Sequence, residues 1–210
     1  MHVPFFSVVI CTYQRGHLID RAISSLLEQV ETDWEAVIVD DGSTDNTPQV
    51  VQKYIDAGAP IRYFRHDHCG VARSRNAGIA LSRGLFVTFL DSDDEYLPNH
   101  LSSRHAMLLQ EPSIWLLHGG VEIVGDAYVR DRHDPSILIH LDDCVIGGTF
   151  VIRRDLFSTL GPFAEIQYAD DAEFFERAAR AGTVIAKTDH PTYRYYRDTP
   201  DALTRTHGTT

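Results

Sequence analysis

The chain has 210 residues, of which 43% are hydrophobic and 23% are charged, a composition typical of one globular domain. Its formal net charge of -11 argues against the broad basic face that nucleic-acid binding requires, and it disfavours unaided binding to anionic lipid. No apolar run approaches the length that spans a bilayer, and the N-terminus lacks a basic segment followed by an apolar one. We therefore expect a single cytoplasmic domain over residues 1–210.

Strand-like and helix-like patterns alternate through the first half of the chain. Short apolar runs rich in β-branched residues predict strands covered on both faces, and apolar residues at helical spacing separate them. This β-α-β-α-β-α-β order predicts a parallel, doubly wound sheet. The expected strands are 5–11, 36–39, 61–64 and 86–90, and the expected helices are 19–27, 47–58 and 71–81.

Polar clusters follow three of these expected strands. Thr12-Tyr13 follows the first strand, Asp40-Asp41 the second, and Asp91-Ser92-Asp93-Asp94 the fourth. Right-handed crossovers would bring the C-terminal ends of these strands to one edge, where open sheets bind ligands. Crowded carboxylates repel one another, and a hard divalent cation would neutralise them. The alternative to a metal site is that the Asp cluster forms a solvated turn without an ion. The convergence predicts a metal-assisted site for a phosphorylated substrate.

The second half of the chain is less regular. We expect helices at 97–109, 155–160 and 170–181 and strands at 114–124, 145–152, 184–187 and 193–196. A polar segment from Asp126 to Asp143 separates the first two strands, and the polar tail 199–210 is expected to be mobile.

The histidines and cysteines show no metal-ligand spacing. Three widely spaced cysteines form no Cys-x-x-Cys pair, which argues against a zinc knuckle or a redox motif. His66 and His68 lie two residues apart, which does not match a helical His-x-x-x-His face. We interpret these histidines as surface or partly buried side chains.

Five segments together resemble the motifs of family-2 glycosyltransferases. Their conjunction in the family's order, over residues 5 to about 182, is more specific than any one of them. The resemblance implies an α/β GT-A fold: a doubly wound, mostly parallel sheet in a nucleotide-binding half (about 1–95) and a smaller mixed region in an acceptor-facing catalytic half (about 96–198). The segments are Phe6–Arg15, Val37–Asp45, Gly70–Gly78, Leu90–Asp94 with Leu97-Pro98, and Asp170–Phe174.

The resemblance also implies a reaction and roles for particular residues. It implies inverting transfer of a sugar from a UDP- or dTDP-sugar to an acceptor hydroxyl, with Mn²⁺ or Mg²⁺ as cofactor. Asp93 would be the principal metal ligand, with Asp91 supporting the metal or facing the ribose, and Asp171 would be the general base. Asp41 would accept a hydrogen bond from the nucleobase. The residues that would contact the nucleotide are Thr12, Tyr13, Arg15, Asp41, Arg75 and Asp91.

Several of these roles have an alternative in ordinary structural chemistry. Tyr13 could cap the sheet edge instead of stacking on a base, and Arg75 could form a structural salt bridge instead of contacting the diphosphate. Asp171 could simply favour the helix dipole at a first helical turn. We favour Asp171 over Asp170 as the base because the family counterpart of Asp170 is commonly Glu, interpreted as a supporting residue. Asp94 is interpreted as support for the metal ligands.

Two departures from the family pattern bear on function. Tyr193–Arg197 has Tyr where many members carry a His that completes the metal site, so either a later residue such as His207 or water would take that place. The chain also ends early relative to larger members and lacks the Gln-x-x-Arg-Trp motif, which disfavours a processive synthase.

Two other functions are alternatives to sugar transfer. A sugar-phosphate nucleotidyltransferase would need a Gly-rich basic loop after the first strand, where Cys11–Gly16 has one glycine. A nucleotide-sugar-binding module without turnover is the non-enzymatic alternative. The expected acceptor is a carbohydrate or glycolipid of the cell envelope, with peripheral contact at the inner face of the membrane. The sequence does not identify the donor sugar, the linkage formed or the oligomeric state.

Overall fold

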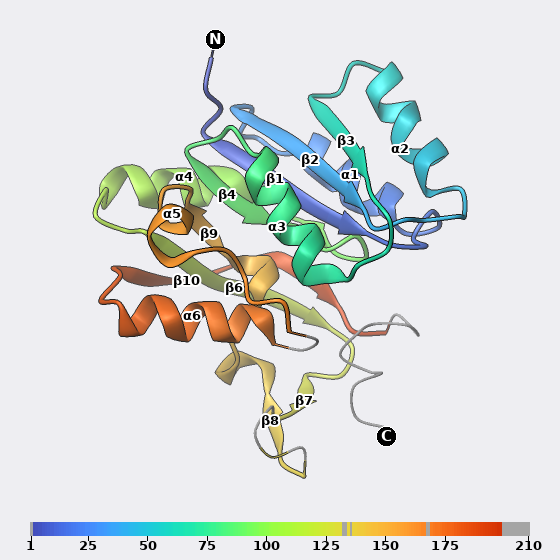
Figure 1. Cartoon of the computed structure of the whole chain (residues 1–210). Helices are drawn as coiled ribbons and strands as arrows, with labels where there is room; N and C mark the ends of the chain where they lie inside the picture. The colour runs from blue at the N-terminus through green and yellow to red at the C-terminus, as the bar shows by residue number, and fades with distance from the viewer. Residues whose placement is uncertain (1, 132–133, 135, 167–168, 199–210) are drawn as a thin grey trace.

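The computed structural model describes residues 2–131, 134, 136–166 and 169–198. A central sheet runs through this part of the chain in the order β3-β2-β1-β4-β9-β6-β10-β5 (Figure 1). Its eight strands are β1 (Phe6–Thr12), β2 (Trp34–Asp40), β3 (Ile61–Arg65), β4 (Phe86–Phe89), β5 (Glu95–Tyr96), β6 (Leu116–Val124), β9 (Val151–Arg153) and β10 (Ile185–Tyr196).

The first half of the sheet is parallel. β1 pairs in parallel with β2 on one side and with β4 on the other, and β2 pairs in parallel with β3. The strand order therefore reverses at β1, and open α/β sheets bind ligands at such a switch point, outside the C-terminal ends of the strands. The predicted parallel, doubly wound sheet is confirmed.

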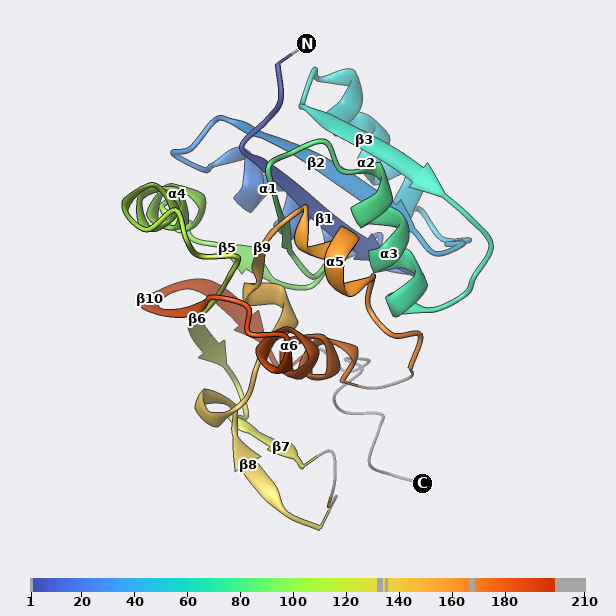
Figure 2. The same cartoon turned by 60° about the vertical axis from the view of Figure 1, so that its left-hand side comes forward.

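Helices cover both faces of the sheet, as a doubly wound fold requires (Figures 1 and 2). Alternate residues of β1 point to opposite faces: Val8 and Ile10 pack into one apolar core and Val9 into the other. The first core is covered by α1 (Ile19–Leu27), α2 (Thr47–Asp56) and α4 (His100–Gln110), and the second by α3 (Val71–Leu81), α5 (Leu156–Leu160) and α6 (Asp170–Arg180). None of the helices in the described ranges has the length and apolarity needed to cross a membrane.

The second half of the sheet is mixed and departs from the sequence predictions. β9 is antiparallel to β4 and β6, while β10 is parallel to β6. The strand expected at 145–152 is a 3-10 turn, η2 (Gly147–Thr149), followed by β9, because the Gly147-Gly148 pair interrupts the apolar run. The strands expected at 184–187 and 193–196 form the single strand β10, whose register shifts around Pro191, a residue without a backbone N–H.

Three short strands were missed by the sequence analysis. β5 follows the Asp cluster and pairs antiparallel with β10. The polar segment 126–143 contains a hairpin of β7 (Tyr128–Arg130) and β8 (Leu138–His140), followed by the 3-10 turn η1 (Leu141–Asp143). This hairpin projects from the body of the molecule (Figure 2). Strands of two or three residues are too short to show the alternation that identifies a strand in a sequence.

Candidate active site

A cavity of about 1100 Å³ opens at the C-terminal edge of the parallel strands. Backbone contacts converge there: Asp41 N donates to Thr12 O (2.9 Å), and Leu90 N donates to Val9 O (3.1 Å), which sets the Asp cluster beside the end of β1. All the residues assigned to the site from the sequence line this one cavity. They are Thr12, Tyr13, Arg15, Asp41, Arg75, Asp91, Asp93 and Asp171.

Two carboxylates of the Asp cluster face the cavity and the third does not. Asp91 and Asp93 line the cavity, and the Asp91 side chain is 37% exposed. Asp94 is fully buried: Tyr193 Oη donates to its Oδ2 (2.7 Å) and Tyr196 N donates to its Oδ1 (2.8 Å). Asp94 therefore holds β10 against the loop after β4, and this contact positions the two cavity-lining carboxylates.

The Asp91 and Asp93 carboxylates fit a hard divalent cation. Burial raises the pKa of the Asp91 carboxyl, Arg75 opposes that rise, and Asp93 adds to it. A carboxylate whose charged form is disfavoured by a like-charged neighbour also favours a cation that neutralises it. Carboxylate oxygens are the donors that Mg²⁺ and Mn²⁺ prefer. The site residues present therefore fit the expected metal, whereas His207 lies outside the described residues, as does the rest of the tail 199–210.

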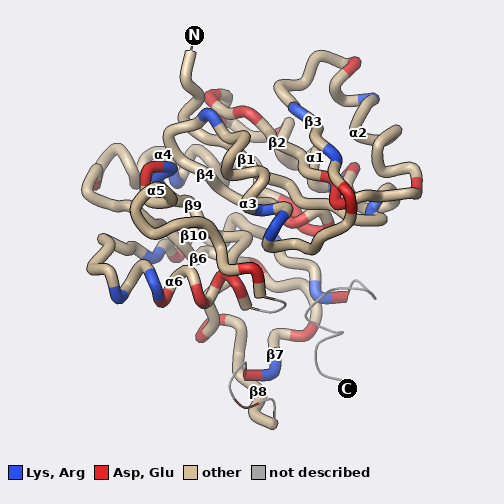
Figure 3. The backbone as a smooth tube through the Cα atoms, in the orientation of Figure 1, with Lys and Arg blue, Asp and Glu red and all other residues tan. Residues whose placement is uncertain are grey.

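Arg75 connects the two halves of the cavity. Its Nη1 donates to both Asp170 oxygens at 2.7 Å, and its Nη2 lies 3.8 Å from Asp91 Oδ1. Burial opposes the charge on the guanidinium, but Asp170 and Asp91 outweigh it and raise the pKa of Arg75. Figure 3 shows basic positions of α3 beside acidic positions at the start of α6. The salt bridge considered as the alternative for Arg75 is thus present, and diphosphate contact stays a prediction.

Asp171 lies in the first turn of α6 and is held by two backbone amides. Gly147 N donates to its Oδ2 (2.8 Å), and Ala172 N donates to its Oδ1 (2.8 Å). Burial raises the pKa of the Asp171 carboxyl, Arg75 lowers it, and Asp170 raises it further. The balance is a carboxylate with a higher proton affinity than an exposed Asp, held in a fixed orientation at the cavity wall.

Gly147 was missed by the sequence analysis, although the Gly-Gly pair could have drawn attention to it. A Cβ at this position would lie 2.7 Å from the Asp171 Cβ and 2.9 Å from its Oδ2. A side chain therefore cannot occupy position 147 while Asp171 keeps its place.

The opposite end of the cavity contains Asp41. Its Oδ1 accepts from Cys69 N (2.7 Å) and its Oδ2 accepts from Gly70 N (2.9 Å), while His68 Nδ1 lies 2.8 Å from Oδ2. His68 also stacks on Tyr13, with ring centroids 4.2 Å apart. His68 and Cys69 were missed as site residues because their contact with Asp41 is made across 27 to 28 positions of chain.

Thr12 lies beside this group at the end of β1. It is 3% exposed, and its Oγ1 has no hydrogen-bond partner among the described residues. An unpaired buried hydroxyl is costly unless a ligand or water completes it. Thr12 therefore offers a polar group at the wall of the cavity.

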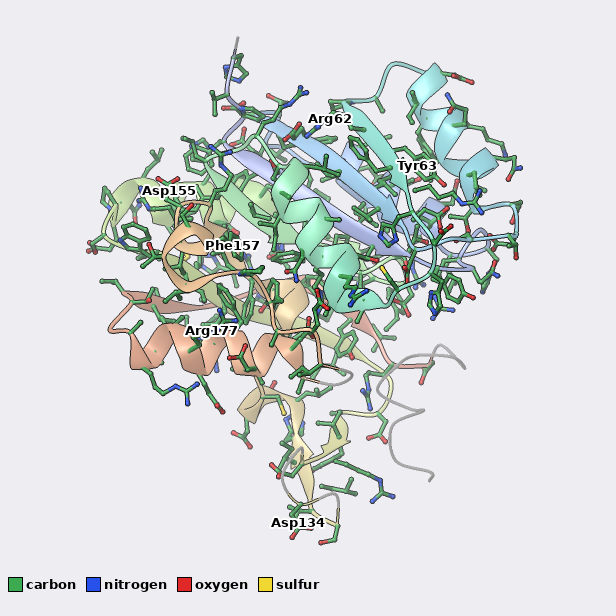
Figure 4. All side chains as sticks on the ribbon, viewed as in Figure 1. Arg62, Tyr63, Asp134, Asp155, Phe157 and Arg177 are labelled. Atoms are coloured by element: carbon green, nitrogen blue, oxygen red, sulfur yellow. The ribbon has the colours of Figure 1, made fainter. Side chains whose placement is uncertain are left out.

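The β7–β8 hairpin and the turn after it form the remaining wall. Their contribution is mostly apolar and includes Val129, Ile139, Leu141, Val145 and Ile146. Figure 4 shows Asp134 at the far end of this hairpin, away from the sheet, and Arg177 on α6. One side of the cavity is therefore rich in carboxylates, and the other is mostly apolar but also contains Arg130 and Asp131.

Comparison with known proteins identifies the family to which the chain is similar. The family described as Glycosyl transferase family 2 matches residues 7–161. An Escherichia coli protein named UDP-Glc:alpha-D-GlcNAc-diphosphoundecaprenol beta-1,3-glucosyltransferase WfgD is 33% identical over 164 residues, 75% of this chain and 62% of that protein. Validoxylamine A glucosyltransferase of Streptomyces hygroscopicus subsp. jinggangensis is 41% identical over 147 residues, 66% of this chain and 32% of that protein.

Solved structures share the fold. S. aureus TarS 1-349 in complex with UDP-GlcNAc superposes with a TM-score of 0.79 at 23% identity, over 94% of this chain and 60% of that one. The mannosyltransferase PcManGT from Pyrobaculum calidifontis, in complex with GDP-Man and Mn²⁺, gives a TM-score of 0.75 at 19% identity, over 98% and 60%. These likenesses confirm the predicted GT-A fold. The chain spans less than two thirds of the length of each of these proteins.

Proposed function

Because the chain belongs to glycosyl transferase family 2, we propose that it transfers a sugar, with inversion, from a UDP- or dTDP-sugar to an acceptor hydroxyl. One observation carries the proposal: a single cavity is lined by the residues proposed for the nucleobase (Asp41), the diphosphate and its metal (Asp91 and Asp93) and the acceptor (Asp171). Inversion by direct displacement needs a base beside the attacking hydroxyl and positive charge beside the departing diphosphate.

Each residue would have a defined part in this reaction. Asp171, oriented by Gly147 N, would take the proton of the acceptor hydroxyl as the new bond forms. Arg75 would stabilise negative charge on the departing diphosphate while Asp170 fixes its position. A divalent cation held by Asp93 and Asp91 would supply further positive charge at the diphosphate.

The nucleotide would lie at the β1–β2 end of the cavity. Asp41 would accept a hydrogen bond from the ring N–H of uracil or thymine, because a carboxylate that already accepts backbone amides still has lone pairs available. The ring of Tyr13 would contact the base on the face that His68 does not cover. Thr12 Oγ1, unpaired among the described residues, and Arg15 would contact the remaining part of the nucleotide.

The acceptor side supports a carbohydrate or glycolipid substrate of the cell envelope. The mostly apolar hairpin wall suits a substrate with an apolar portion, and the name of the WfgD relative includes a diphosphoundecaprenol substrate. Such an acceptor would bring a cytoplasmic enzyme into peripheral contact with the inner face of the membrane. The name of WfgD and the complex of TarS also support a UDP-linked donor.

Turnover distinguishes an enzyme from a binding module. The purified chain, incubated with UDP-sugars, Mn²⁺ and lipid-linked sugar acceptors, is expected to release UDP at a rate that depends on the acceptor. Binding of UDP with Mn²⁺ but without release of UDP from any donor and acceptor would contradict the transferase and leave the binding module.

A side chain at position 147 is expected to lower turnover. Gly147→Ala places a Cβ 2.7 Å from the Asp171 Cβ, so the carboxylate must move, and small misplacements of a catalytic group are costly. We expect kcat to fall by about tenfold or more while the Kd for UDP, measured by calorimetry, stays within about twofold. An unchanged kcat would show that Asp171 does not act from this position.

The pH dependence of kcat/KM should report the raised pKa of Asp171. A base must be deprotonated to act, so activity rises as pH rises through its pKa. Because burial raises the pKa of Asp171 in the folded protein, the acid limb should lie above the value of about 3.9 for an exposed Asp. Measurement of kcat/KM across acidic pH at saturating metal tests this, and an acid limb at or below the exposed value would contradict it.

A further inference from the structure

A second group of metal-ligating side chains lies at the nucleotide end of the cavity, apart from the Asp91 and Asp93 carboxylates. One ligand atom from each of Asp41, His66 and Cys69 lies within 4.8 Å of the others. His66 Nδ1 is 3.4 Å from Cys69 Sγ and 3.4 Å from Asp41 Oδ1. These residues come from the end of β2 and the loop between β3 and α3, so the fold brings them together across more than 20 positions of chain.

The two distances match the edges of a tetrahedral zinc site. Zn–S bonds of about 2.3 Å and Zn–N or Zn–O bonds of about 2.0 Å, at tetrahedral angles, place neighbouring ligand atoms about 3.3 to 3.6 Å apart. A set of one thiolate, one imidazole and one carboxylate suits a borderline-soft cation, whereas Mg²⁺ and Ca²⁺ prefer oxygen alone. Three protein ligands would leave the fourth position for water.

The neighbours of the cluster could hold its ligands in place. His68 Nδ1 lies 2.8 Å from Asp41 Oδ2, and the Cys69 and Gly70 amides also bond this carboxylate. His66 Nε2 lies 3.3 Å from Ser74 Oγ, a contact of the kind that orients metal-bound imidazoles.

The immediate surroundings of His66 Nδ1 favour a cation. Asp67 O (2.8 Å), Asp41 Oδ1 and Cys69 Sγ all converge on this nitrogen, and one ring proton can be donated to only one of them at a time. A cation would interact with the imidazole, the carboxylate and the thiolate together. Its binding would break the contact with Asp67 O and release the thiol proton to solvent.

We propose that Asp41, His66 and Cys69 form a Zn²⁺ site, distinct from the Asp91 and Asp93 carboxylates, and that Zn²⁺ bound there competes with the nucleobase. The competition rests on the proposed function, because it follows from the use of Asp41 by both ligands. The metal site itself stands on the geometry of the cluster. His66 is partly buried, as the sequence analysis expects, and the proposal adds a ligand role to it.

Metal binding is tested without nucleotide in an Asp93→Ala background, which weakens the other metal site. Titration with Co²⁺, a spectroscopic substitute for Zn²⁺, is expected to produce a thiolate-to-cobalt charge-transfer band that stoichiometric Zn²⁺ removes. Cys69→Ser is expected to abolish the band, and His66→Gln to weaken Zn²⁺ affinity by about tenfold or more. Cys144→Ser, which alters a cavity-lining thiol outside the cluster, is expected to leave both unchanged.

Absence of the band in the Asp93→Ala protein, or its persistence after Cys69→Ser, would overturn the site. A separate titration of UDP in excess Mg²⁺ tests the competition. At a Zn²⁺ concentration ten times the Kd for Zn²⁺, the apparent Kd for UDP should rise by about tenfold. Cys69→Ser should remove this rise. Zn²⁺ binding with no effect on UDP would overturn the competition alone. Failure of UDP to bind under any condition would count against the proposed function and leave the cobalt result standing.

Discussion

Asp171→Asn is expected to reduce turnover by a hundredfold or more, about 2.7 kcal/mol in activation free energy, while UDP binds with near-parental affinity. Asparagine has one carbonyl oxygen, so it can keep the hydrogen bond from either Gly147 N or Ala172 N and loses the other, which costs about 1 to 3 kcal/mol of stability. It cannot take a proton from the acceptor hydroxyl. The measurement is kcat with a saturating donor, together with calorimetric Kd for UDP.

Asp56→Asn provides the matched control for this change. Asp56 is an exposed carboxylate at the end of α2, outside the cavity, where it accepts a hydrogen bond from Gln52. Its amide variant should leave kcat and UDP affinity unchanged. Near-parental turnover in the Asp171 variant would show that another residue acts as the general base, and the neighbouring Asp170 would then be the candidate.

Asp93→Ala is expected to abolish transfer and to remove the metal dependence of UDP binding. The expected metal would contact the protein through carboxylate oxygens, and loss of its principal ligand would leave Asp91 as the one carboxylate of the Asp91–Asp94 cluster that lines the cavity. The readout is the ratio of the Kd for UDP in EDTA to that in Mn²⁺, which should be large in the parent protein and close to one in the variant.

Asp56→Ala serves as the control here, since it removes an equal charge from an exposed position. Retention of the parental EDTA-to-Mn²⁺ ratio in the Asp93 variant would contradict the metal role. Because the ratio is measured without an acceptor, the result does not depend on identifying the sugar that is transferred.

The nucleotide half could be predicted in detail because its signals are local. Apolar runs such as that ending at Cys11 identify strands, and the rule of right-handed crossovers then predicts that Thr12, Asp41 and Asp91 lie at one edge. The structure places these residues at one edge, around the cavity. Here a short-range pattern and one topological rule were sufficient.

The catalytic half could be predicted less well because its contacts join distant segments. The pair of Arg75 and Asp170 spans 95 positions, and the bond from Gly147 to Asp171 depends on a turn that was expected to be a strand. Packing between elements decides such contacts, and no periodicity in the sequence reports them. The same holds for His66 and Cys69, whose spacing along the chain does not reveal their approach to Asp41.

Calorimetric titration of UDP, dTDP, GDP, ADP and CDP into the protein, first with Mn²⁺ and then with EDTA, tests the central claim most directly. The proposed function predicts binding confined to uridine and thymidine diphosphates, weakened when the metal is removed. Asp41 would select these bases and Asp93 would hold the metal. Failure of every diphosphate to bind, or equal binding of all of them without metal, would contradict a nucleotide-sugar site in this cavity.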